Sequence, residues 1–166
     1  MEETRRIGLT LHQEAADASG YAFRVAFDDT AIPELSTDES PPLGLGGGPD
    51  PTRLLAAAVA NCLGASLLFA LRKFRNSPGP LRTRATATLA RNPAGRWRVV
   101  HIEAELQLAE AAAEHHPLER LLAQFEDFCI VTESVRHGVP VTVAVVDAQG
   151  VRLHGAGPAG EGAAGG

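Results

Sequence analysis

The chain has 166 residues, about the size of one ordinary domain, with 45% hydrophobic and 21% charged residues. These fractions are typical of a globular protein and exclude extensive disorder. The formal net charge of −5 argues against a nucleic-acid partner, because binding to phosphate needs a basic surface.

Two segments near the N-terminus predict a β-hairpin. Residues 7–13 and 21–28 both alternate apolar and polar side chains, which is typical of half-buried strands. Residues 17–20 lie between them and read Asp-Ala-Ser-Gly, a composition that favours a tight turn.

The next segment, residues 28–50, is predicted to be an irregular loop, because it holds four prolines and the glycine-rich run Gly44–Gly48. A loop this long in a small domain is more often functional than idle. The run does not match the dinucleotide-binding pattern, because Pro49 takes the place of the third glycine. Two interpretations stay open: a flexible connection into a capped helix, or backbone amides at the helix start that hold an anion.

A long buried helix is predicted to begin after Asp50. Asp50 and Pro51 form a favourable N-cap and first helical residue, and Ser77-Pro-Gly-Pro is expected to stop the helix at about Asn76. Its side chains are apolar almost all round, which is usual for a buried helix. Its length indicates an interface or a sheet wrapped around it. One face consists of Leu55, Ala58, Cys62, Ala65 and Phe69.

The sequence indicates a soluble, cytoplasmic protein. Its first residues lack the basic-then-apolar order of a secretory signal. The longest apolar stretch, residues 54–71, is interrupted by Asn61, Gly64 and Ser66, so it falls short of a convincing membrane span. Two cysteines in a reducing compartment are expected to rest as thiols.

A β-ribbon and a second helix are predicted next. Residues 81–90 and 97–108 alternate as strands do and are joined by a turn at Asn92-Pro-Ala-Gly. A helix is expected from Pro117 to about Cys129. The apolar face of the second strand is expected to hold Val100, Ile102, Ala104 and Leu106.

The remaining residues predict a short helical turn over residues 132–136 and a last strand over residues 139–146. We therefore expect a single domain over residues 1–154. The Gly/Ala-rich tail, residues 155–166, is expected to be disordered.

The two cysteines are the candidates for chemistry, although a cysteine on a buried helix face is often only a small hydrophobic side chain. A redox role needs two thiols that meet in space and a group that stabilises a thiolate. A metal site needs three or four convergent ligands. Cys62, Cys129 and His137 lack the spacing of such ligands, so we predict neither a metal nor a cofactor.

The strings around the two cysteines carry a resemblance. The first is GPDPTRLLAAAVANCL over residues 48–63, and the second is FEDFCIVTESVRHGVPV over residues 125–141. The two cysteines are 67 positions apart, and residues 38–44 read DESPPLG. Together these features resemble the OsmC/Ohr family of peroxide-reducing thiol proteins. The resemblance extends over about residues 5–148.

This resemblance implies an α+β fold, with antiparallel sheets wrapped around long central helices in an intertwined homodimer. It implies that Cys62 attacks an organic hydroperoxide and becomes a sulfenic acid, which Cys129 resolves to a disulfide. It also implies a dithiol reductant, such as a dihydrolipoyl protein.

The sequence departs from the family at two supporting positions. Thr52 stands ten residues before Cys62, where peroxidase members have a glutamate, and the first hairpin turn lacks their arginine. Arg24 or Arg53 is the candidate replacement for the cation, and Glu39 for the carboxylate. Because a charged hydrogen bond contributes about 1.5–3 kcal/mol, losing this arrangement is expected to slow peroxide attack.

Two functions follow from these features. One is a thiol-dependent peroxidase that reduces organic hydroperoxides. The other is a protein of the same fold without efficient peroxidase activity, which acts as a small-molecule-binding or redox-sensing dimer, and Thr52 favours this alternative.

Overall fold

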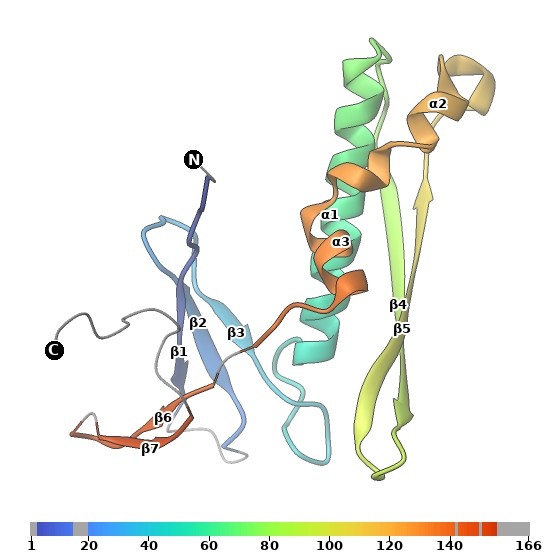
Figure 1. Cartoon of the computed structure of the whole chain (residues 1–166). Coiled ribbons are helices and arrows are strands. Elements are labelled where there is room, and N and C mark those ends of the chain that lie inside the picture. The colour runs from blue at the N-terminus through green and yellow to red at the C-terminus, as the bar shows by residue number, and fades with distance from the viewer. Residues whose placement is uncertain (1–2, 15–19, 142, 150, 156–166) are drawn as a thin grey trace, which may run out of the picture. The chain divides into compact units, whose positions relative to one another are not determined.

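The computed structural model describes residues 3–14, 20–141, 143–149 and 151–155, and their α+β architecture confirms the predicted fold class (Figure 1). Most of the predicted hairpin turn and the predicted tail lie outside these residues. The chain divides into two compact units, Met1–Thr132 and Glu133–Gly166. The single domain expected over residues 1–154 stays a prediction.

The N-terminal sheet has three antiparallel strands in the order β1-β2-β3. Strands β1 (Leu9–Gln13) and β2 (Phe23–Phe27) form the predicted hairpin, and Val25 at its centre is buried. Strand β3 (Leu35–Thr37) lies in the segment predicted to be a loop. Three residues are too few to show the alternation by which a strand is recognised in a sequence.

Helix α1 (Pro51–Lys73) begins as predicted. The Asp50 carboxylate accepts the backbone N–H of Arg53 at 2.9 Å, which satisfies one of the free amides of the first turn. The helix ends before Asn76, because Arg75 has a left-handed backbone with φ of 62°. The N–H groups of Arg75 and Asn76 bond back to the carbonyls of Arg72 and Leu71, which is a Schellman ending.

Strands β4 (Arg82–Arg91) and β5 (Trp97–Gln107) form a long antiparallel ribbon beside α1 (Figure 1). Its apolar face is as predicted at Ile102, Ala104 and Leu106, which pack on the core. Val100 is exposed instead, because a bulge opposite Thr88 and Leu89 adds a residue to β5 and reverses the alternation there. The prediction for Val100 is therefore wrong.

The turn of this ribbon is held by Asn92, whose side-chain oxygen accepts the N–H groups of Ala94 and Arg96. Next to the turn, the guanidinium of Arg91 lies 4.5 Å from the centre of the Trp97 ring. This is a cation–π contact, and Trp97 stays 56% exposed.

The predicted helix over residues 117–129 is in fact broken. The chain forms the 3₁₀ turn η1 (Ala112–Glu114), helix α2 (Leu118–Leu122) and the 3₁₀ turn η2 (Phe125–Phe128). Helix α3 (Ile130–His137) follows directly and includes the predicted helical turn. The sequence has no strong helix breaker at residues 123–129, so local preference is overridden by tertiary packing.

The core of the first unit lies where α1 meets α2, η2 and the ribbon. Helix α1 is long and apolar enough to cross a membrane, with a mean hydropathy of 2.1, and it is the only such helix among the described residues. Its buried side chains identify it as the core helix. The buried core cluster consists of Val59, Leu63, Leu67, Ala70, Leu71, Leu121, Phe125 and Cys129.

The second unit contains a short antiparallel pair, β6 (Val145–Val146) and β7 (Arg152–His154). Of the strand predicted over residues 139–146, residue 142 lies outside the described part, and among the others only Val145–Val146 form a strand. Val139 and Val141 are exposed, and Pro140 has no N–H to donate to a neighbouring strand.

Candidate functional site: a pair of buried thiols

The structure brings the two cysteines together. Cys62 lies in the middle of α1 and is half-buried, with part of its side chain packed on the core. Cys129 follows η2, which packs on α1, and its side chain has no exposed surface. Each thiol is among the causes of the other's pKa shift, so the two side chains lie close together, and both are free thiols. A redox pair needs two thiols that can meet, and this proximity satisfies that requirement.

Cys129 occupies the N-cap position of α3. Its own N–H donates to the Glu126 carbonyl at 2.8 Å, which closes η2 and turns the chain into the next helix. The backbone N–H of Thr132, three residues later, is among the groups that lower the pKa of the Cys129 thiol. The N-terminus of a helix favours negative charge, so this position suits a thiolate.

Two hydroxyl groups also lie near the Cys129 sulfur. Its Sγ atom lies 2.9 Å from Oγ1 of Thr132 in a buried hydrogen bond. The side chain of Ser66, one helical turn after Cys62, is near enough to the same sulfur to lower the pKa of Cys129. Ser66 and Thr132 are both buried, so these contacts are shielded from water.

The thiols have opposite pKa shifts. Burial is the main cause that raises the pKa of Cys62, the bond to Cys129 adds to it, and the N–H groups of Val131 and Thr132 oppose it. Burial also acts to raise the pKa of Cys129. The bonds from Cys62, Thr132 and Ser66 outweigh it, so the pKa of Cys129 lies below its usual value.

Arg24, the first candidate cation, is engaged in the N-terminal sheet. Its guanidinium pairs with Glu14 at 2.8 Å and with Glu34 at 3.3 Å, and these two carboxylates raise its pKa. Both partners stand beside β1 and β3. Arg24 therefore stabilises the sheet, and the structure does not bring it to Cys62.

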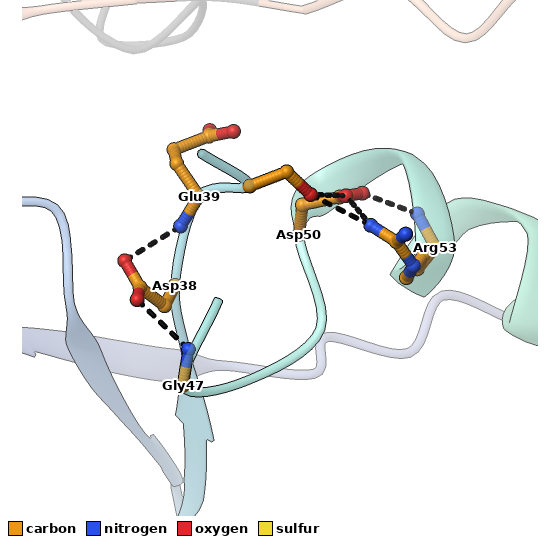
Figure 2. Close-up of polar contacts among 6 residues, drawn as sticks. Asp38, Glu39, Gly47, Asp50 and Arg53 are labelled. Atoms are coloured by element: carbon orange, nitrogen blue, oxygen red, sulfur yellow. Dashed lines mark hydrogen bonds and ion pairs between the residues drawn. The ribbon is translucent and has the colours of Figure 1, made fainter. Parts of the chain in front are cut away.

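Arg53 points toward the start of its own helix (Figure 2). It pairs with the Asp50 carboxylate and donates to Ser40 Oγ at 2.9 Å. Nine residues separate Arg53 from Cys62, roughly 13 Å along the helix axis. In this conformation its guanidinium is directed away from the thiols.

Glu39, the candidate carboxylate, and Thr52, which stands where peroxidase members have a glutamate, also lie near the start of α1. The backbone N–H of Glu39 donates to the carboxylate of Asp38, which also accepts the N–H of Gly47 at 2.9 Å (Figure 2). Thr52 is half-buried in the first turn of α1, roughly 15 Å along the axis from Cys62. Asp38 thus organises the loop before α1, and neither Glu39 nor Thr52 is linked to the thiols by any contact found.

Sequence reasoning missed Ser66 and Thr132. Thr132 follows Cys129 by three residues, but cysteine is not among the residues that favour an N-cap, so the local sequence does not single out this pair. Ser66 carries no local signal either, because Cys129 is 63 residues away in the chain. Among the described residues, no three His, Cys, Asp or Glu side chains gather as metal ligands.

Several solved structures have the same fold as this chain. The chain matches an OsmC-like protein of unknown function from Vibrio cholerae with a TM-score of 0.63 and 17% identity, over 79% of this chain and 94% of the other. It matches an organic hydroperoxide resistance protein from Legionella pneumophila with a TM-score of 0.61 and 16% identity, over 81% of this chain and 92% of the other. It also matches the organic hydroperoxide resistance protein OhrB of Bacillus subtilis, with a TM-score of 0.58 and 17% identity, over 82% of this chain and 95% of the other. At these identities, the likeness shows the fold.

The family follows from the sequence match. The family model for OsmC-like proteins matches residues 44–144, which is more than half of the chain and includes both cysteines. The chain therefore belongs to the OsmC-like family, as the resemblance implied. Among curated proteins, none matches it by sequence.

Proposed function

We propose that this protein is a thiol-dependent peroxidase that reduces organic hydroperoxides with Cys62 and Cys129. The observation that carries the proposal is the proximity of the half-buried thiol of Cys62 to the buried thiol of Cys129 in one apolar core. The hydroperoxide resistance proteins among its structural relatives support the substrate class. The apolar core around Cys62 favours an organic peroxide over hydrogen peroxide.

The reaction has two chemical steps and a reduction. The Cys62 sulfur attacks a peroxide oxygen, the O–O bond breaks, an alcohol leaves and Cys62 becomes a sulfenic acid. The Cys129 sulfur then attacks the Cys62 sulfur, which forms the disulfide and releases water. A dithiol reductant returns both residues to thiols by thiol–disulfide exchange.

The second candidate function is a redox-sensing or small-molecule-binding protein without efficient peroxidase activity. It is favoured by the engagement of Arg24 and Arg53 with other carboxylates, and by the raised pKa of Cys62. A thiol that stays protonated at neutral pH is a poor nucleophile.

A homodimer in the cytoplasm is part of the proposal. One side of α1 is apolar and exposed, including Ala58, Ala65 and Phe69, the last being 56% exposed. A second copy of the chain packed on this side would remove these apolar side chains from water.

The first test measures hydroperoxide consumption. With an organic hydroperoxide and a dithiol reductant, we expect turnover by the wild-type protein and a loss of at least about 100-fold in Cys62→Ser. Cys129→Ser should complete one turnover and then stop, because its sulfenic acid has no resolving thiol. Equal, near-background rates for the wild type and Cys62→Ser would rule out the peroxidase.

Mass spectrometry separates the two candidates. Stoichiometric formation of the Cys62–Cys129 disulfide within the first turnover supports the enzyme. Thiols that stay inert to peroxide would support the binding function instead. Disulfide formation without sustained turnover would support the redox sensor.

A further inference from the structure

Thr132 makes a hydrogen bond with one of the two thiols. The thiol of Cys129 donates to Oγ1 of Thr132, and the sulfur and oxygen atoms are 2.9 Å apart. Cys129 has no exposed surface and Thr132 is 6% exposed, so water does not compete for this bond. Cys129 also belongs to the buried core cluster on which Cys62 packs. The bond therefore lies at the redox pair itself.

The backbone around Cys129 keeps its sulfur beside Thr132. The N–H of Cys129 donates to the Glu126 carbonyl at 2.8 Å, and α3 begins at the next residue, Ile130. With the main chain held in this way, the place of the sulfur depends on a single torsion, χ1, which has three staggered minima. The bond to Thr132, in the first turn of α3, favours the minimum in which the two side chains meet.

We propose that Thr132 sets the redox potential of the Cys62–Cys129 pair, because its hydroxyl group bonds more strongly to the reduced Cys129 sulfur than to a disulfide sulfur. Thr132 is thus a positioning residue that acts through Cys129. The inference rests on the proposed function in one respect, since it needs a disulfide between the two cysteines. Its consequence is that this disulfide is easier to reduce than it would be without Thr132.

Each chemical form of the Cys129 sulfur offers Thr132 a different bond. A thiol donates its proton to Oγ1, as in this structure. A thiolate accepts a charge-assisted bond from the same hydroxyl group, which is stronger than a bond between neutral groups. A disulfide sulfur has no proton to donate and is only a weak acceptor. Thr132 therefore stabilises the reduced sulfur in either protonation state, and its buried oxygen loses a donor when the pair is oxidised.

The protons and electrons balance against a dithiol such as dithiothreitol. When the pair is oxidised, both S–H bonds break and the S–S bond forms between Cys62 and Cys129. Two electrons and two protons pass to oxidised dithiothreitol, whose own S–S bond breaks. The reverse reaction is the reduction that closes the proposed cycle. Because Thr132 favours the thiols, it makes this last step more favourable.

The test measures the equilibrium between thiols and disulfide at pH 7 in mixtures of reduced and oxidised dithiothreitol or glutathione. Mass spectrometry after alkylation gives the fraction of Cys62–Cys129 disulfide. Thr132→Val removes the hydroxyl and should raise the equilibrium constant for disulfide formation by about three- to tenfold. For a two-electron couple, this change lowers the potential by about 15–30 mV. Thr132→Ser restores a hydroxyl and should return the constant toward the wild-type value.

Thr37→Val is the matched control. Thr37 is also buried, and its hydroxyl donates to the Phe23 carbonyl at 3.3 Å in the N-terminal sheet. This variant loses a buried threonine hydroxyl that has no bond to a thiol, so its equilibrium constant should equal that of the wild type. An unchanged constant in Thr132→Val, or an equal shift in both variants, would overturn the proposal.

Thermal unfolding of the reduced and disulfide forms gives a second measure. Thr132→Val should lower the Tm of the reduced protein more than that of the disulfide form, because only the reduced form loses the thiol–hydroxyl bond. Thr37→Val should lower both values equally. Thr132→Ala, which a helix accommodates readily, supplies the same comparison if the valine variant does not fold. Equal losses in the two forms of the Thr132 variant would refute the role.

The potential is measured without peroxide, so this inference and the peroxidase fail separately. A shifted constant in a protein that does not consume hydroperoxide would reject the peroxidase and keep the role of Thr132. Turnover of hydroperoxide with an unchanged constant would keep the peroxidase and reject the role. The absence of a Cys62–Cys129 disulfide in every redox mixture would overturn the inference.

Discussion

Asn76 connects the end of α1 to the chain that leads to Cys129. Its side chain donates to the carbonyls of Leu71 and His116 at 3.2 and 3.1 Å, and accepts the N–H of His116 at 2.9 Å. Asn76→Ala should lower the free energy of unfolding by about 1–2 kcal/mol, which is less than the full sum for three bonds because the two bonds to His116 are exposed to water. Local opening should then expose Cys129 to thiol reagents about tenfold more often.

The matched control is Asn92→Ala, which removes the same side chain from the ribbon turn. Peptide mass spectrometry after brief labelling should show faster modification of Cys129 only in Asn76→Ala. Identical labelling of Cys129 in Asn76→Ala and the wild type would show that these bonds do not control access to the thiol.

At the residue scale, the sequence predicts the role of a side chain best when its partner is close to it in the chain. The N-cap Asp50 is an example, because its partner is three residues away. The cysteine pair was selected from its surrounding strings, and the structure brings the two thiols close together. The roles expected of Arg24 and Arg53 depended on the direction of long flexible side chains. Their nearest carboxylates decide that direction, and a sequence does not show which ones these are.

At the scale of the element, the ending of α1 carries a measurable strain. Arg75 adopts a left-handed backbone that costs a residue with a Cβ atom roughly 1–2 kcal/mol, whereas glycine adopts it freely. Arg75→Gly should therefore raise the free energy of unfolding by roughly 0.5–1 kcal/mol, after its extra freedom in the unfolded chain is counted. Chemical denaturation with an unchanged slope is the measurement.

The control for this change is Arg72→Gly, three residues earlier in the last turn of the helix. There the backbone is helical, so glycine should destabilise the protein by about 1 kcal/mol. The two substitutions remove the same charge and should act in opposite directions. A loss of stability in Arg75→Gly would contradict the strain at this ending.

The sequence predicts a helix or strand well where the element's own hydrophobic period is repeated many times. The long apolar helix and the two ribbon strands have many repeats of their period, and they form close to the expected bounds. The break in the helix before Cys129 and the bulge at Val100 depend on packing against other elements. Strand β3 has three residues and exists through its pairing with β2, so no local pattern announces it.

At the scale of the molecule, the exposed apolar side of α1 predicts the proposed dimer. Ala65→Glu places a charge on this side at an exposed position that glutamate suits well in a helix. In a dimer that buries the side, the unpaired charge should weaken association by about 100-fold or more. Analytical ultracentrifugation should show a dimer for the wild type and a monomer for Ala65→Glu.

Ala94→Glu, in the turn of the ribbon, is the matched control and should stay dimeric. Circular dichroism should be unchanged in both variants, because both positions are exposed in the single chain. Dimers of equal stability in Ala65→Glu and the wild type would place the interface elsewhere.

The position of the single tryptophan decides what fluorescence can report about this protein. Trp97 is half-exposed at the first position of β5, next to the ribbon turn, and its ring contacts the guanidinium of Arg91. Its emission therefore follows the opening of the ribbon turn, whereas far-ultraviolet circular dichroism follows α1. Comparing the two transitions shows whether the ribbon and the helix unfold together or in separate steps.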